Sequence, residues 1–186
     1  MLKKMIVLAA SLCATAAMAQ AAPYAGQQTR SIKALSDREI TELETGQGMG
    51  LAKAAELNGY PGPAHVLEHA EALGLNAHQR SATQALFDEH KARARRLGAE
   101  LLEKERALDR AFAAREIDPA TLARLTRGIG ELQAQLREEH LRTHLAQTAL
   151  LEPRQVQRYA VLRGYSSGAG GTLSPQTTPS SHGKHH

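Results

Sequence analysis

The stretch "EIDPATL", residues Glu116–Leu122, decides the fold because one helix ends there and the next begins. Asp118 is a good N-cap, and Pro119 fits the first helical position. Ile117 can pack against Leu122 as a hydrophobic staple. A link this short makes the two flanking helices run antiparallel. The sequence therefore predicts an all-α protein built on a long antiparallel helical hairpin with short flanking helices.

Both arms of this hairpin have the periodicity of amphipathic helices. From Asn76, the predicted N-cap, to about Glu116 the chain has no proline, and only Gly98 weakens the helix. The first arm carries a stripe at spacings of three, four or seven: Leu86, His90, Leu97, Leu101, Leu108 and Phe112. The second arm continues at spacings of three and four: Leu122, Leu125, Ile129, Leu132 and Leu136.

A Leu-x-x-x-Gln phrase precedes the hairpin and a second one follows it: "LNAHQ" from Leu75 to Gln79, and "LEPRQ" from Leu151 to Gln155. In each, we expect the leucine to close the preceding turn and the glutamine to lie in the first turn of a new helix. One copy alone is ordinary helix-start chemistry. Two copies that flank one hairpin are more informative. Pro153 opens the last short helix.

Short helices are also predicted before the hairpin. Ser36 and Glu39 form a capping box, and the glycines of "GQGMG" divide the following run into two short helices joined by a bend. A third helix, "AHVLEHAEAL", should end at Gly74. The "GQGMG" bend lacks the preceding strand and the Lys-Ser/Thr pair of a phosphate loop, so it is a turn.

The two ends of the chain differ from the helical part, residues 35–165. Residues 1–19 have the basic start, apolar run and "AMA" cleavage pattern of a signal peptide, which predicts a periplasmic protein. An uncleaved membrane anchor is the alternative. The only cysteine, Cys13, lies in this segment, so the mature chain excludes disulfides and thiol catalysis. Residues 20–34 read as a flexible arm, and residues 166–186 as a disordered Gly/Ser/Pro/His tail.

Charge and composition exclude two broad functions. The net charge falls from +4 to +2 once Lys3 and Lys4 leave with the signal peptide, which gives no footprint for nucleic acid. No Ser/His/Asp framework, thiol or cofactor loop indicates an enzyme, and no cofactor is required. The acidic and basic residues of the first long helix alternate as surface ion pairs usually do.

The motifs, the hairpin and the signal peptide together resemble the Spy/CpxP family of periplasmic stress proteins, over about residues 35–165. Family members carry two Leu-Thr-x-x-Gln motifs; here Asn76 and Glu152 stand in place of threonine. The resemblance implies a cradle-shaped homodimer that binds unfolded or misfolded envelope proteins without ATP. It also allows an inhibitor that docks on an envelope sensor kinase.

The same resemblance points to a basic and apolar client-binding face on the first long helix: Phe87, Lys91, Arg93, Arg95, Arg96, Leu97 and Leu101. Positive charge would speed encounter with clients, and small apolar contacts would hold them weakly. The alternative is that the charges form a solvated face and the apolar residues form the core or a dimer seam.

Histidines occur in spaced sets. His65 and His69 are four residues apart, as are His140 and His144, and the tail carries His182, His185 and His186. Folding the hairpin about Ile117 puts His144 opposite His90, with His140 one turn away. Imidazoles suit Zn, Ni, Co or Cu. "HVLEH" matches a zinc-protease signature, but the chain has no room for such an enzyme's domain.

The histidine order is similar to that of periplasmic nickel–cobalt sensor proteins. His65 and His69, Glu89 and His140 follow the order of the sensors' metal ligands, while His144 stands where those proteins have methionine. This departure leaves the metal open. The alternative is that the buried histidines are hydrogen-bonded helix residues without a ligand. The sequence thus favours a chaperone first, and a metal-binding sensor or buffer second.

Overall fold

The computed structural model describes residues 22–166, and in that range the protein is all-helical with no β-strand. The predicted signal peptide and the tail from residue 167, with its three histidines, lie outside the described residues. Among the described helices, none is both long enough and apolar enough to cross a membrane. The predicted all-α class and the helical hairpin are confirmed.

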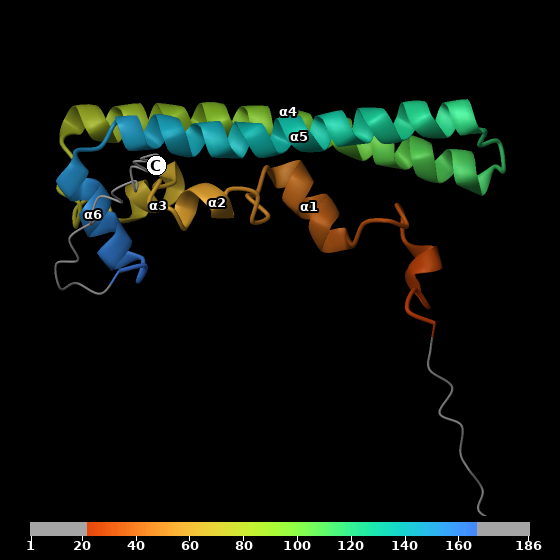
Figure 1. Ribbon diagram of the computed structural model, residues 1–186, viewed down its shortest axis with the longest axis horizontal. Coiled ribbons are helices and arrows are strands. Elements are labelled where there is room, and N and C mark those ends of the chain that lie inside the picture. The colour runs from red at the N-terminus through yellow and green to blue at the C-terminus, as the bar shows by residue number, and fades with distance from the viewer. Residues whose placement is uncertain (1–21, 167–186) are drawn as a thin grey trace, which may run out of the picture.

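The long helices α4 (Ala77–Ala113) and α5 (Pro119–Ala149) form the hairpin (Figure 1). Asn76 caps α4 by accepting from the Gln79 backbone N–H at 2.8 Å. Asp118 caps α5 by accepting from the Thr121 N–H at 2.6 Å. Side-chain oxygens at these N-caps satisfy backbone donors that a helix start leaves free. Both predicted caps are confirmed, and they fix where each arm begins.

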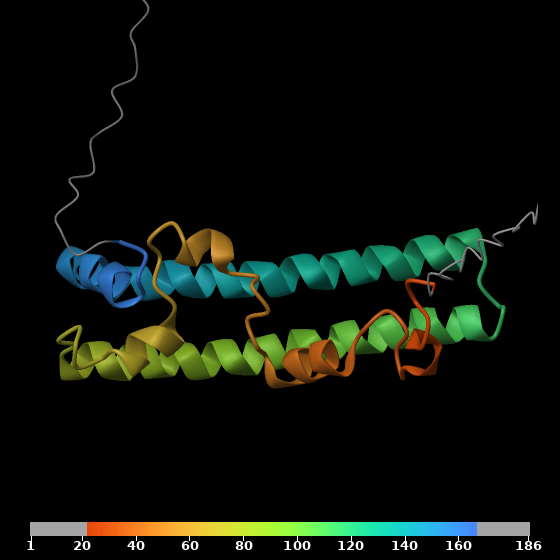
Figure 2. The ribbon, with the colours of Figure 1, turned by 90° about the horizontal axis from the view of Figure 1, so that it is seen from below.

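Three short helices cover one face of the hairpin: α1 (Asp37–Thr45), α2 (Lys53–Glu56) and α3 (Pro63–Glu68). The helices α1 and α3 pack mainly on α4, whereas α2 packs on α5, so the connecting segments cross between the long helices (Figure 2). The helix predicted to reach Gly74 ends earlier, at Glu68, and turns follow it. These crossings place loop atoms over the seam between α4 and α5.

The main core lies between the hairpin and α1, and it contains Leu43, Leu97, Leu101, Ile129 and Leu136 among its buried side chains. Gly98 lets α1 approach, because a β-carbon there would lie 2.3 Å from the Leu43 carbonyl oxygen. The residue predicted only to weaken α4 therefore makes room for a helix crossing.

The segment that the sequence suggested as a loose arm docks on α4 at its C-terminal end. Ile32 is buried in the main core. The Lys33 ammonium lies 3.0 Å from the Asp109 carboxylate, and the Lys33 backbone N–H donates to the same side chain at 3.3 Å. Apolar burial and an ion pair thus hold this end of the segment along the outer half of the hairpin.

The two Leu-x-x-x-Gln phrases meet at the other end of the hairpin, where α6 (Pro153–Leu162) begins. Gln79 donates to the Gln155 side-chain oxygen at 2.8 Å, and Gln155 donates back at 3.1 Å. Each glutamine oxygen also accepts from the N–H of the residue before its own helix, Asn76 or Glu152. Leu75 is buried in a second core with Tyr159, and Leu151 packs against it. The repeated motif therefore closes the base of the hairpin.

Candidate functional site

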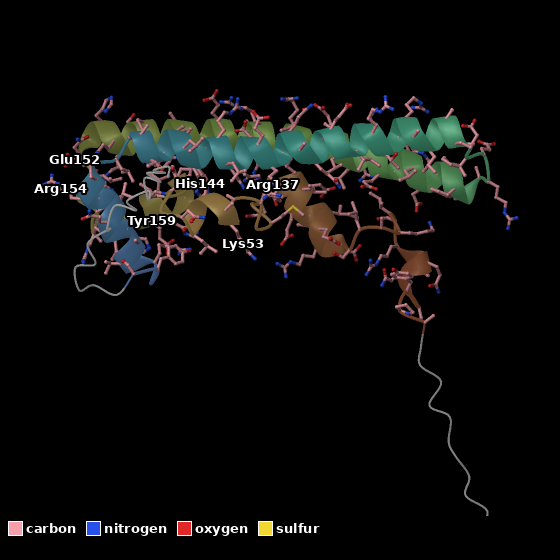
Figure 3. The ribbon with its side chains drawn as sticks, in the orientation of Figure 1. Lys53, Arg137, His144, Glu152, Arg154 and Tyr159 are labelled. Carbon is pink, nitrogen blue, oxygen red and sulfur yellow. The ribbon has the colours of Figure 1, made fainter. Side chains whose placement is uncertain are left out.

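A pocket of about 370 Å³ lies beneath the crossing segments, between the long helices and the layer of short helices. Four histidines line it: His65 from α3, His90 from α4, and His140 and His144 from α5. Figure 3 shows His144 on the side of the hairpin where Lys53 of α2 and Tyr159 of α6 also lie. We call this cavity the histidine pocket.

His90 is buried, and its Nδ1 atom is held by oxygen partners. Nδ1 lies 3.1 Å from the Thr143 hydroxyl and 3.3 Å from Glu139 Oε1. The Thr143 hydroxyl donates its single proton to the Glu139 carbonyl at 2.8 Å, so it accepts from His90. This arrangement assigns the ring proton to Nδ1 and leaves the lone pair on Nε2.

Charge within this cluster supports the same assignment. Burial alone would raise the Glu139 pKa, but hydrogen bonds from Arg142 and His90 bring that pKa below its usual range. Burial lowers the pKa of His90 despite the attraction of Glu139. At neutral pH the pair therefore consists of a neutral imidazole that donates to an ionised carboxylate.

His140 packs edge-on against His90, with ring centroids 4.6 Å apart and an interplanar angle of 73°. The residue is 4% exposed, and burial, followed by the neighbouring His90, lowers its pKa to about 4. Its Nε2 atom is buried and has no hydrogen-bond partner among the described residues. A neutral buried imidazole with one unsatisfied nitrogen is unusual, and it suits a ligand.

His144 and His65 repeat the arrangement seen at His90. The His144 Nδ1 donates to the Tyr60 carbonyl at 2.7 Å. The His65 Nδ1 lies 3.1 Å from the Glu68 carboxylate, in an i,i+3 pair on α3. Histidines that bind metals usually donate the second ring N–H to a carboxylate or a carbonyl, which fixes the tautomer. Three of the four pocket histidines have this orientation.

The side chains are not gathered into a finished metal site. Within residues 22–166, no three His, Cys, Asp or Glu side chains lie close enough together to hold a metal ion as they stand. The unsatisfied nitrogen of His140 and the oriented imidazoles around it nevertheless fit a metal that prefers nitrogen ligands. Binding would require the pocket side chains to move closer together.

Two of the metal ligands expected from the sequence lie elsewhere. Glu89 points to solvent and forms an ion pair with Arg93, one turn further along α4. Glu89 precedes His90 by one residue, so it lies about 100° around the helix from the pocket-lining face. His69 is the C-cap residue of α3 and does not line the pocket. The structure therefore does not bring these two residues together with the other expected ligands.

Most of the proposed client-binding residues are engaged within the fold. Leu97 and Leu101 are each 5% exposed and belong to the main core, so they are not on a client-facing surface. Lys91 donates to the Thr45 and Gly46 carbonyls at 2.8 and 3.0 Å. Phe87 lines the histidine pocket.

The arginines of the same run lie closer to solvent. Arg96 pairs with Glu100 at 2.8 Å, and Arg95 lies 3.4 Å from the Thr45 carbonyl. Arg93, besides its pair with Glu89, lies 3.8 Å from the buried Glu139. Client binding by this run stays a prediction, with Arg95 and Arg96 its most accessible members.

Sequence reasoning missed Glu56, Tyr60 and Met49, which come from the short-helix layer. Glu56 and Met49 line the pocket, and the Tyr60 carbonyl orients His144. Met49 has φ +48, in the left-handed region that is uncommon for residues other than glycine. Only this unusual backbone could have hinted at a role for the "GQGMG" turn, and it is not visible in the sequence.

Comparison with known proteins gives one family. A family model described as heavy-metal resistance matches residues 48–158, more than half of the 186-residue chain. The match begins in the glycine-rich turn and runs through the hairpin into α6, so it includes every residue that lines the pocket except Gly46, Gln47 and Arg163. Curated proteins and solved structures give no match. The chain therefore belongs to the heavy-metal resistance family.

Proposed function

We propose that this protein binds a Zn, Ni, Co or Cu ion in the histidine pocket and acts in the periplasm as a heavy-metal sensor or buffer. The observation that carries the proposal is the shared orientation of His65, His90 and His144, each with Nδ1 hydrogen-bonded to an oxygen. Family membership supports it, since the family is described by heavy-metal resistance.

The protonation of the pocket favours metal uptake. Burial keeps His90 and His140 neutral at neutral pH, so a metal need not displace a proton from either ring. Three cations also line the pocket and oppose a divalent ion, but two of them are already engaged. Lys91 donates to backbone carbonyls, and Arg163 to Glu56. Lys53 lies at the exposed rim.

The experiment separates the pocket from the histidines of the tail. In a chain with His182, His185 and His186 replaced by Ala, stripped with chelator, isothermal titration with each metal should give one bound equivalent. His144→Gln should weaken binding by about tenfold or more. The exposed His78→Gln is the matched control and should change nothing. Equal uptake by the His144 variant, or none by the parent, would overturn the proposal.

A second candidate is the ATP-independent chaperone that the Spy/CpxP resemblance implies. Three large apolar side chains favour it, since they are exposed in the segment between α1 and α3: Met49 at 39%, Leu57 at 62% and Tyr60 at 39%. Light scattering of a denatured client without ATP, with and without zinc, tests this function. Suppression by the metal-free protein, reduced in Leu57→Ser, would support it; unchanged client aggregation in both states would exclude it.

Dimerisation belongs to this second proposal. A single long hairpin with a thin covering layer buries little core for its length, and small helical scaffolds often gain stability from a partner. Analytical ultracentrifugation gives the mass directly. A monomer at the concentrations that suppress aggregation would remove the dimeric cradle from the account.

A further inference from the structure

We infer that Glu56, and not Glu89, supplies the carboxylate ligand to a metal in the histidine pocket. This inference rests on the proposed function. Glu56 is the last residue of α2, and its side chain is 14% exposed. Both it and His144 line the pocket. Carboxylate oxygen combined with imidazole nitrogen is a common ligand set for zinc.

The first oxygen of Glu56 is fully engaged. Oε1 accepts from the Tyr159 hydroxyl at 2.6 Å, from the Tyr165 hydroxyl at 3.1 Å and from Arg163 Nε at 3.4 Å. These donors come from α6 and the residues just after it. They fix the carboxylate plane, as hydrogen bonds to metal-ligating carboxylates commonly do.

The second oxygen has no such partner. Oε2 is buried and makes no hydrogen bond to the described residues. It lies 3.7 Å from His144 Nδ1, beyond hydrogen-bond distance, and that nitrogen already donates to the Tyr60 carbonyl at 2.7 Å. A buried carboxylate oxygen without a donor costs free energy, which a bound cation would offset.

The unsatisfied atoms of the pocket are thus of the two kinds that a zinc ion uses. Glu56 offers an oxygen from α2, and His140 offers a nitrogen from α5. Glu89 cannot substitute, because it points away from the pocket and pairs with Arg93. Glu56 also precedes His65 in the chain, so a pattern that seeks the carboxylate after the histidine pair does not find it.

Zinc chloride titrated into the chain with its three tail histidines replaced by Ala tests the inference. Glu56→Gln keeps the size of the side chain and an oxygen for Tyr159, but it removes the charge. We expect its zinc affinity to fall by about tenfold or more. The matched Glu89→Gln should stay within about twofold of the parent. Circular dichroism checks that each variant is folded, and the shorter Glu56→Asp replaces Glu56→Gln if that variant does not fold.

A second readout needs no variant in the pocket. Carbon-13 spectra of glutamate-labelled protein should show zinc shifting the Glu56 carboxyl signal while the Glu89 signal stays in place.

The titrations separate this inference from the proposed function. If the parent binds zinc and His144→Gln lowers the zinc affinity, but Glu56→Gln does not, the Glu56 assignment is wrong and the proposal of a metal in the histidine pocket is kept. If the parent takes up none of the four metals, the proposed function fails and the Glu56 assignment fails with it.

Discussion

Gln79 and Gln155, separated by 76 residues, donate hydrogen bonds to each other's side-chain oxygens at 2.8 and 3.1 Å. Each amide also bonds a backbone carbonyl: Gln79 donates to Leu150, and Gln155 to Leu73. The pair is buried, so its polar atoms depend on one another for satisfaction. This reciprocal contact explains why the same short motif occurs both before and after the hairpin in the sequence.

Replacing either glutamine should therefore destabilise the protein. Gln79→Ala and Gln155→Ala should each lower the free energy of unfolding by about 1–3 kcal/mol, because each leaves its partner unsatisfied. The double variant should lose clearly less free energy of unfolding than the sum of the losses in the two single variants. Urea unfolding of the parent, the two single variants and the double variant measures these losses, with Gln133→Ala at an exposed position as control. Additive losses would show that the two amides do not act as a pair.

The starts of the two long helices followed from local chemistry. Asn76 and Asp118 are caps whose partners lie three residues away, so the sequence contains all the information needed to place them. The reciprocal glutamine contact could not be predicted in this way, because it depends on how distant segments meet. Leu97 and Leu101 follow His90 by seven and eleven residues, so all three lie on one face of the helix. Their burial follows from the same stripe that predicted the helix.

The site was predictable only in part. The sequence placed His90 and the His140/His144 pair at one level of the hairpin, and the structure brings all three to one pocket. The sequence did not reveal Glu56, because α2 is a four-residue helix whose position depends on two loop crossings. Matching the order of ligands selected Glu89, since order along a chain says nothing about which side of a helix a residue occupies.

Gly98 provides a test of the α1–α4 contact. Gly98→Ala should lower the free energy of unfolding by about 1–3 kcal/mol, because the new β-carbon would meet the Leu43 carbonyl. In α5, Gly130→Ala meets nothing within 4 Å. That variant should gain about 0.5–1 kcal/mol from helix propensity. Thermal unfolding compares them; stabilisation by both would mean that α1 does not approach so closely.

Glu105 should make stability depend on pH. It is buried on α4, and burial raises its pKa above the usual 4.5. The folded state therefore holds this proton more tightly than the unfolded state, so stability is lost as pH rises through the folded pKa. Glu105→Gln should raise the thermal midpoint at pH 7 by roughly 2–4 °C and give no gain below pH 4. An equal gain from the exposed Glu131→Gln would point to net charge instead.

Gly62 makes room for the ring of His144. An added β-carbon would lie 2.8 and 2.9 Å from its Cε1 and Nε2 atoms. Gly62→Ala should displace the ring and lower zinc affinity by about tenfold, with little change in helix content. Gly48→Ala is the control, since its β-carbon only reaches His140 Nδ1 at 4.0 Å. Isothermal titration measures both; unchanged affinity in Gly62→Ala would separate zinc binding from the position of His144.

The most direct test of the metal account is an anomalous difference map at the zinc absorption edge. Crystals would be grown with zinc from the chain in which His182, His185 and His186 are replaced by Ala. We expect one strong peak inside the pocket, about 2.0–2.1 Å from ring nitrogens of at least two of His65, His90, His140 and His144. Peaks confined to the protein surface, with none in the pocket, would contradict it.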